Sequence, residues 1–519
     1  MRPRPSGLPA RPTLAPAPGA GHPCDRGGPR ATMKVLLVQP ASPRTHWPRG
    51  SFRSRWVPTG LAYLAAAARR ARHDVRIHVR EEELIKNGYD WAHANARLRA
   101  LLAEFRPEAI GLSATTPLVP EAAALARLAK EVCGDSTLVV IGGPHATALP
   151  EATLAECPWI DAAAIGEGES TLVELLERGV GQDVAGICYR KEGGFVRTAP
   201  RAPERDLDAL GPPPYDLFDM AHYTARDRWM VRWLPLRAAN LRTSRGCPNT
   251  CHFCAGHLVS GLGVRFHSVP YVVELMRFAA ERLGVEAIHF EDDTIGASRP
   301  RLLELCGAIR QAGLHRRVRW DALLRATQAD PEALREMKAA GCIQVEFGFE
   351  SGSDAMLRNL NKNTTVETNL RAARLAREAG LRIYADIMVG LPGETEADLR
   401  ATLRFVRKAR PDVISFSRLY PLPGTAIYNA LSEADRAALS WADYAYMDAA
   451  RLPVNLTAMP AERFNRLYHE IDKYWLGPAL AWQLYRDTPR EEASRRRLLA
   501  RRLLRFCLIH PLRALRIPW

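Results

Sequence analysis

The sequence predicts an α/β protein with a doubly wound parallel-sheet domain, a partial (β/α)6 barrel and a helical carboxyl-terminal region. In two long stretches of the 519-residue chain, short apolar runs typical of buried strands alternate with helical patterns. Such alternation with short turns indicates parallel sheets covered by helices. No uninterrupted apolar run reaches about 18 residues, so the sequence does not predict a membrane-spanning helix.

Composition and charge narrow the class of protein. Hydrophobic residues make up 47% and charged residues 25%, as in ordinary soluble globular proteins. The net charge is +15, but residues 1–32 hold five Arg and one acid, and residues 486–519 hold ten Arg and three acids. The two ends therefore carry most of the net positive charge. The long middle is close to neutral, which argues against a nucleic-acid partner.

Residues 1–32 are rich in Pro, Arg, Ala and Gly and show no apolar periodicity. We expect a disordered extension there, since such a composition buries too little apolar surface to offset the entropy of ordering. The folded chain, and with it the start of translation, is predicted at Met33. An Arg-rich targeting peptide is the alternative.

A doubly wound, Rossmann-like domain is predicted over residues 33–205. Its expected strands are Val35–Val38, Val75–Val79, Ala109–Leu112, Leu138–Ile141 and Ala162–Ile165. The segments SATTP, GGPHAT and GEGES follow the third, fourth and fifth strands. Ligands of such sheets bind at the carboxyl ends of the strands, so these segments are the candidate binding loops.

A packed linker is expected over residues 206–236, and the barrel series over 237–431. The expected barrel strands are Arg237–Thr243, Ala287–Glu291, Val318–Ala322, Gln344–Glu350, Arg382–Met388 and Val413–Leu419. The chemistry of such a barrel belongs at the carboxyl ends of these strands.

Residues 432–519 are predicted to form a helical cap with a basic amphipathic end, RRRLLARRLLRFCLI at 495–509. A helix of this kind can lie on an anionic membrane. A helix packed on the barrel with an Arg-rich solvent face explains the pattern equally well.

Cys247, Cys251 and Cys254 follow directly on the first barrel strand, in the order Cys-x3-Cys-x2-Cys. Three thiolates within eight residues can bind an iron–sulfur cluster with one iron left open. A zinc site completed by His252 or His257, and chance clustering, are the alternatives.

This motif at the start of such a barrel resembles that of the radical S-adenosylmethionine (SAM) enzymes. FEDDT at Phe290–Thr294, WDALLRA at Trp320–Ala326 and GCIQVEFGFESGS at Gly341–Ser353 are similar to the cobalamin-dependent branch, which includes class B methyltransferases and anaerobic magnesium-protoporphyrin cyclases. The resemblance implies a 4Fe–4S cluster on the three cysteines. It implies SAM contacts at the following strand ends: Asp292, Asp293, Arg325, Glu350 and Ser351. The acids Asp292, Asp293 and Glu350 suit the amino group and hydroxyls of SAM, and Arg325 suits its carboxylate.

The first domain resembles the cobalamin-binding domain fused to this branch. The resemblance places cobalamin against small residues of the binding loops: Ser113, Ala114, Thr115, Gly142, Gly143 and Gly166. Many cobalamin proteins carry Asp-x-His-x-x-Gly after the first strand, with the His bound to cobalt. That motif is missing here, because His46 lacks an Asp two residues before it. We therefore expect cobalamin to be held without a lower His ligand.

The resemblance implies an enzyme that methylates an unactivated carbon of a lipid or secondary metabolite, through a 5′-deoxyadenosyl radical and methylcobalamin. A reductant such as a flavodoxin or ferredoxin would serve it. We expect a cytoplasmic protein, with peripheral membrane contact through residues 486–519 if the basic helix binds lipid. Radical oxidative cyclisation or ring rearrangement without methyl transfer is the alternative reaction. A non-enzymatic cobalamin-binding regulator is the alternative class.

Overall fold

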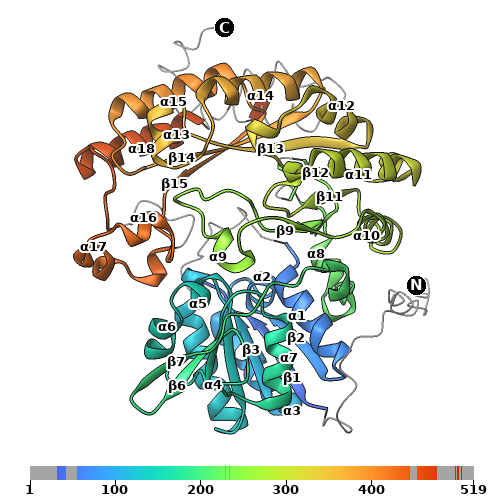
Figure 1. Ribbon diagram of the computed structural model, residues 1–519, viewed down its shortest axis with the longest axis vertical. Helices are drawn as coiled ribbons and strands as arrows, with labels where there is room; N and C mark the ends of the chain where they lie inside the picture. The colour runs from blue at the N-terminus through green and yellow to red at the C-terminus, as the bar shows by residue number, and fades with distance from the viewer. Residues whose placement is uncertain are drawn as a thin grey trace.

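The computed structural model describes residues 32–42 and 55–475, except 228–229, 233 and 445–452, and four isolated positions between 497 and 504. The predicted extension at 1–32 and the basic end at 486–519 lie almost wholly outside the described residues. Two sheets dominate the fold. In Figure 1 the first lies in the lower half, in blue and teal, and the second lies in the upper half.

The first sheet has the strand order β2-β1-β3-β4-β5-β6-β7. Its strands are β1 (Lys34–Gln39), β2 (Asp74–Val79), β3 (Ala109–Ser113), β4 (Leu138–Gly142), β5 (Ala162–Ala164), β6 (Ile187–Lys191) and β7 (Gly194–Arg197). The first five are parallel, which confirms the doubly wound prediction. The antiparallel hairpin β6–β7 was not predicted from the sequence.

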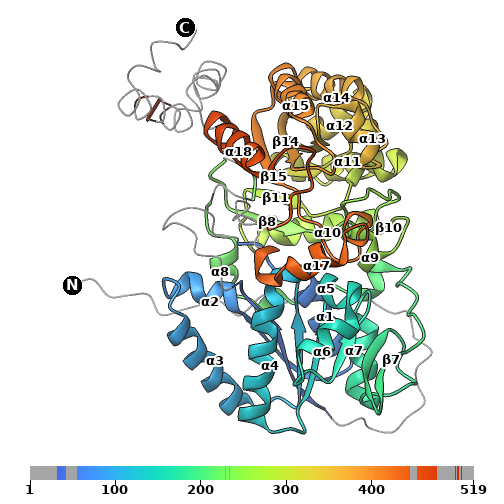
Figure 2. The same cartoon turned by 90° about the vertical axis from the view of Figure 1, so that its left-hand side faces the viewer.

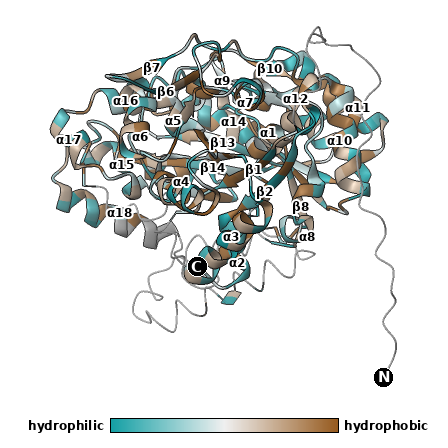
Figure 3. Cartoon of the chain, turned by 90° about the horizontal axis from the view of Figure 1, so that it is seen from below, coloured by the Kyte–Doolittle hydropathy of each residue, from teal (hydrophilic) through white to brown (hydrophobic). Residues whose placement is uncertain are grey.

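Both faces of this sheet are apolar because helices cover both. Val35 and Leu37 of β1 pack on one side, whereas Leu36 and Val38 pack on the other. The helices of this domain are α1 (Thr59–Arg70), α2 (Arg80–Lys86), α3 (Trp91–Phe105), α4 (Val119–Cys133), α5 (Pro144–Ala148), α6 (Pro150–Glu156) and α7 (Glu169–Arg178). Seen from below, the helices carry both brown and teal residues, as expected of amphipathic helices between core and solvent (Figure 3).

The second sheet is fully parallel, in the order β15-β14-β13-β12-β11-β8. Its strands are β8 (Ala238–Leu241), β11 (Ala287–Phe290), β12 (Arg319–Leu323), β13 (Cys342–Glu350), β14 (Arg382–Val389) and β15 (Val413–Arg418). This order and the helices between the strands confirm the open, six-stranded partial barrel. A short antiparallel pair, β9 (Ser244–Arg245) and β10 (Arg265–Phe266), follows β8.

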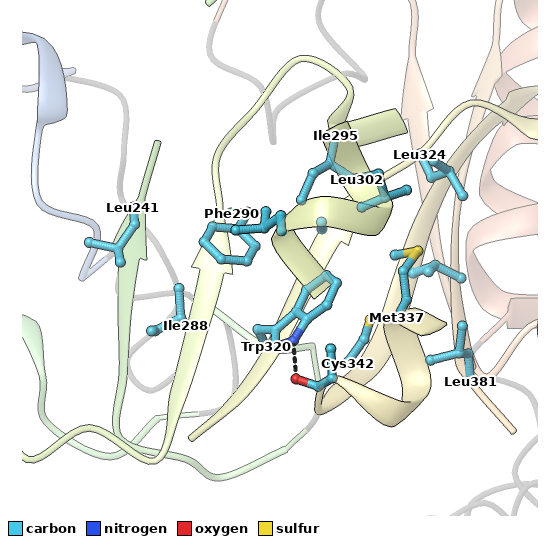
Figure 4. Close-up of a cluster of buried hydrophobic side chains, with 14 of the residues drawn as sticks. Leu241, Ile288, Phe290, Ile295, Leu302, Trp320, Leu324, Met337, Cys342 and Leu381 are labelled. Carbon is cyan, nitrogen blue, oxygen red and sulfur yellow. Dashed lines mark hydrogen bonds between the residues drawn. The ribbon is translucent and has the colours of Figure 1, made fainter. Parts of the chain in front are cut away.

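The barrel helices are α9 (Gly256–Ser260), α10 (Val269–Glu281), α11 (Arg299–Gln311), α12 (Pro331–Ala339), α13 (Asp354–Asn359), α14 (Val366–Glu378) and α15 (Glu396–Ala409). Side-chain caps begin most of the long ones, at Ser268, Ser298, Asp330, Thr365 and Thr395. The helices pack on the outer face of the sheet around Trp320, which is fully buried and donates a hydrogen bond of 2.8 Å to the carbonyl of Ala340 (Figure 4).

Within residues 206–236, buried Tyr215 and Phe218 and the short helix α8 (Met220–Tyr223) pack against the second sheet. After the barrel come α16 (Ala426–Asn429), α17 (Glu433–Ala438) and α18 (Ala461–Trp475). This region returns to the first domain, and α17 lies near α5 in Figure 2. The ring of Trp441 lies 4.8 Å from that of His145. Within the described residues, no helix has the length and apolar character needed to cross a bilayer.

Candidate active site

The cysteine motif lies on a loop whose first residues are held by one buried carboxylate. Asp292 accepts hydrogen bonds of 2.5 to 3.2 Å from the backbone N–H and the hydroxyl of both Thr243 and Ser244. The oxygens of Asp292, a predicted SAM contact, are therefore engaged in shaping the loop. Its exposed neighbour Asp293 accepts a hydrogen bond of 3.1 Å from the N–H of Gly246. We assign Asp292 to positioning and keep Asp293 as a candidate SAM contact.

Gly246 sets the turn that leads into Cys247. Its φ is +92°, and a Cβ atom there would lie 2.4 Å from the carbonyl oxygen of Gly263. Only glycine fits at this position without a backbone shift. The path of the loop is thus fixed at both its side-chain and its backbone contacts.

Each of the three thiols accepts a hydrogen bond from a nitrogen. Asn249 donates to Cys247 at 3.3 Å, and the N–H of Gly256 donates to Cys254 at 3.4 Å. The guanidinium of Arg325 donates to buried Cys251 at 3.7 Å. Burial raises the pKa of Cys254, and the hydrogen bond from Gly256 opposes that rise. Hydrogen-bond donors around a sulfur favour the thiolate, which is the form that binds metal.

The alternative zinc ligand His252 is half-buried, and its Nδ1 lies 2.7 Å from the carbonyl oxygen of Asn359. Among the described residues, no three His, Cys, Asp or Glu side chains are grouped closely enough to hold one metal ion. A cubane differs from a single ion in this respect, because its cysteines bind different irons.

Arg325, which contacts Cys251, is linked to Glu350 through Lys362. Arg325 donates a hydrogen bond to the carbonyl of Lys362, and the ammonium of Lys362 lies 2.7 Å from the carboxylate of Glu350. Glu350 has a φ of +62°, which is strained for a residue with a side chain, and a bulge precedes it. Such strain is concentrated at functional sites. The side chain of Lys362 is a member of this site that the sequence analysis did not assign.

Ser351 lies apart from this network. It is fully buried, and its hydroxyl lies 3.2 Å from that of Thr402 on α15. Its contacts are thus with the helix layer, and its assignment as a SAM contact stays a prediction.

A cavity of about 210 Å³ lies at the carboxyl ends of β1, β3, β4 and β5. This includes the switch point between β1 and β3, where ligands of such sheets bind. Four of the predicted cobalamin contacts line it: Ser113, Gly142, Gly143 and Gly166. Ala114 and Thr115 are not in its lining, and the backbone of Ala114 instead supports Gly143 from behind. His46 lies outside the described residues.

The barrel supplies part of the wall of this cavity, which the sequence did not reveal. Arg242, Arg245, Val259 and Ser260 line it together with Tyr63 of α1. Arg245 reaches across to the GEGES loop, where it forms an ion pair of 2.7 Å with Glu169. The cysteine loop and the cavity therefore share one wall.

The inner face of the barrel is polar. Residues that alternate with the buried apolar ones point inward from successive strands: His289, Asp321, Gln344, Glu346, Tyr384, Asp386, Ser415 and Ser417. The ring of His289 lies 3.2 Å from Asp321, which Gln344 contacts at 3.3 Å. Burial and then the neighbouring carboxyl of Glu346 raise the pKa of Asp386 well above its usual value.

Two family models match the chain. The "B12 binding domain" matches residues 48–176, and the "Radical SAM superfamily" matches residues 241–406. The "Uncharacterized methyltransferase PH0819" of Pyrococcus horikoshii is 32% identical over 84% of this chain and 90% of its own length. The chain belongs to the cobalamin-dependent radical SAM family.

Other members of the family extend the comparison. The "Anaerobic magnesium-protoporphyrin IX monomethyl ester cyclase" of Cereibacter sphaeroides is 27% identical over 88% of this chain and 72% of its own length. The solved structure of the radical SAM methyltransferase TsrM from Kitasatospora setae, with cobalamin and a [4Fe-4S] cluster bound, shares the fold with a TM-score of 0.62. It is 22% identical, over 79% of each chain.

The cofactors of the family are a 4Fe–4S cluster, SAM and cobalamin, and the residues present fit all three. Three hydrogen-bonded thiols on one rigid loop suit the cluster. The exposed carboxylate of Asp293 and the guanidinium of Arg325 are close enough to the thiols to receive SAM beside them. The glycine-lined cavity gives cobalamin close access to the backbone. These individual contacts are our assignments.

Proposed function

We propose that this radical SAM enzyme transfers a methyl group to an unactivated carbon of a polar small molecule. The observation that carries the proposal is the wall shared by the two cofactor regions. Arg245 lies two residues before Cys247 and contacts Glu169 in the lining of the cavity assigned to cobalamin. A radical formed at the cluster and a methyl carrier in the cavity would therefore both reach the space between the sheets.

The chain itself binds, orients and excludes water. When bound, the cofactors supply a 5′-deoxyadenosyl radical from SAM and a methyl group carried by cobalamin. Cys247, Cys251 and Cys254 would hold the cluster, while Asp293 and Arg325 would orient SAM. The placement of the groups is the protein's contribution, because the radical chemistry belongs to the cofactors.

The polar inner face of the barrel points to the substrate class. A fully apolar lipid would bury the carboxyls of Glu346 and Asp386 with no hydrogen bond beyond the one they make to each other. A small molecule with hydroxyl, amide or amine groups would add hydrogen bonds to them. Relatives named for such substrates include "Cytidylyl-2-hydroxyethylphosphonate methyltransferase" from Streptomyces wedmorensis, which is 26% identical over 77% of this chain. "Hopanoid C-3 methylase" of Methylococcus capsulatus is 26% identical over 88% of this chain. A lipid substrate is therefore the competing outcome.

The test is an anaerobic incubation of the reconstituted enzyme with cobalamin, a chemical reductant, deuteromethyl-labelled SAM and small-molecule extract from the source cells. Methyl transfer yields S-adenosylhomocysteine and 5′-deoxyadenosine together, with the label in a product that mass spectrometry identifies. C251A is the control and should give neither compound. Label-free products from the wild-type enzyme would contradict methyl transfer.

Oxidative cyclisation is the second candidate, because the magnesium-protoporphyrin cyclase aligns over most of this chain. It predicts 5′-deoxyadenosine without S-adenosylhomocysteine in the same incubation.

Two partners also belong to the proposal. A flavodoxin or ferredoxin would reduce the cluster, and the basic end at 486–519 would bring the enzyme to an anionic membrane. Vesicle flotation with and without residues 486–519 tests the second point. Equal recovery of the two proteins would contradict it.

A further inference from the structure

Arg245 is a buried cation at the boundary of the two domains. Its side chain is 6% exposed, and its guanidinium lies 4.9 Å from the ring centre of Tyr63. It contacts Glu169 at 2.7 Å and Glu167 at 3.4 Å. Glu167 is also bound by Arg265, at 2.5 Å, on the paired strand β10. Four charged groups of the GEGES loop and the barrel thus form one network of ion pairs.

These contacts do not use all the donors of Arg245. Its Nε–H is buried and has no hydrogen-bond partner among the described residues, and the same is true of the Nε–H of Arg242. Both residues line the same cavity as Gly142 and Gly143. Buried donors without partners are destabilising, so two of them beside one cavity indicate a ligand that supplies acceptors.

We propose that Arg242 and Arg245 of the barrel bind an acceptor oxygen of cobalamin, so that the corrinoid is held by both domains. Cobalamin offers two kinds of acceptor, the carbonyl oxygens of the corrin amides and the phosphate oxygens of the nucleotide loop. A guanidinium suits either one through charge-assisted hydrogen bonds.

The consequence is a direct mechanical link between the two cofactor sites. Ser244 is clamped by Asp292, and the backbone of Gly246 is bound to Asp293 and packed against Gly263. Arg245 lies between these fixed points, and Cys247 follows immediately. A corrinoid held by Arg245 is therefore placed at a set position relative to the cluster loop.

The experiment measures the dissociation constant of hydroxocobalamin by visible absorption, with the cluster-loaded full chain and without SAM or substrate. R245Q should raise the dissociation constant on the order of tenfold or more. The matched control is R265Q, which removes an ion pair to the same Glu167 from a residue outside the cavity lining. It should change the constant by less than about threefold. Iron content, measured for each variant, should stay at the wild-type value.

The source of the acceptor is read from a second titration with cobinamide, which lacks the nucleotide loop. A retained difference between wild type and R245Q assigns the corrin amides, and a lost difference assigns the phosphate. If R245Q does not fold, R242Q carries the same expectation.

An unchanged affinity of R245Q for hydroxocobalamin would overturn the proposal. Equal weakening by R245Q and R265Q would also overturn it, because Arg245 would then only hold the two domains together. Failure of the wild type to bind hydroxocobalamin would overturn it as well. Because binding is measured without turnover, these outcomes are independent of whether the enzyme transfers a methyl group.

Discussion

The two parallel sheets of this enzyme are built from similar β/α units but use their strands differently. In the first sheet, successive residues of β1 are apolar on both faces and pack under helices on each side. In the second sheet, Val345, Phe347 and Phe349 of β13 pack under helices, while Gln344 and Glu346 between them face the interior. The first sheet has its cavity at the carboxyl ends of its strands, whereas the second sheet presents a polar inner face.

The difference follows from which face is covered. A doubly wound sheet has no unoccupied face, so a ligand can meet only the loops at the carboxyl ends of its strands. An open barrel leaves its concave face to be filled by side chains or by ligands. Here that face carries carboxyls, an amide and hydroxyls rather than the branched apolar residues that fill a closed barrel. We infer that the cofactors bind at the carboxyl ends of the strands and that the substrate binds against the concave face of the barrel.

Removal of Cys251 should have the largest effect. C251A takes one of three thiols from the edge of the second sheet, so we expect iron content to collapse and activity to fall by more than about a hundredfold. The measurement is iron and sulfide analysis with the SAM cleavage rate. The control is C306A, which alters a fully buried thiol of α11 whose pKa burial raises to about 12. Iron loss in C306A as well would show that the loop is not the cluster site.

The next largest effect separates the two acids at the end of β11. D292N removes charge-assisted bonds to Thr243 and Ser244, and we expect the cysteine loop to lose about 3 kcal/mol of stability and part of its iron. D293N should keep the cluster and weaken the change that SAM causes in its electron paramagnetic resonance spectrum. The reverse pattern would make Asp292 the SAM contact that the resemblance implies.

A smaller effect concerns a buried carboxyl away from the inner face of the barrel. Glu394 follows β14 and accepts bonds from the N–H groups of Gly390 and Leu391, and burial raises its pKa from 4.5 to about 7. Its protonated form contributes stability that is fully present below pH 4.5 and is lost as the pH rises through about 7. Relative to E394Q, the wild type should therefore lose about 2 kcal/mol in urea unfolding between pH 5 and pH 8.

The exposed E396Q variant is the control for that measurement, because Arg400 and Arg463 lower the pKa of Glu396 instead of raising it. A wild-type curve parallel to that of E394Q would show that Glu394 does not titrate in this range.

The sequence predicts the strands of both sheets because their apolar runs and turn residues are local signals. It also predicts the cysteine loop, whose ligands are contiguous. It does not predict the hydrogen bonds of Asp292 to the cysteine loop or the contact of Lys362 with Glu350. It also does not predict that residues of the barrel line the cobalamin cavity. Those contacts join residues far apart in the chain, such as Arg245 and Glu169, and depend on how the two domains meet. The hairpin β6–β7 was missed because its short strands are half exposed.

The smallest expected effect tests whether two carboxyls on the inner face of the barrel titrate as a pair. Glu346 and Asp386 share one buried environment, and burial raises the pKa of both. Each carboxyl contributes stability when it is protonated. This stability is lost as the pH rises above the pKa of that carboxyl in the unfolded chain. In a double-mutant cycle of E346Q and D386N, the coupling energy should become less favourable by about 1 kcal/mol between pH 5 and pH 8. A cycle of E346Q with E378Q, on the outer surface of α14, should show no such change. A flat result for the inner pair would mean that the two carboxyls titrate independently, and the contrast with the apolar first sheet would then lose its functional meaning.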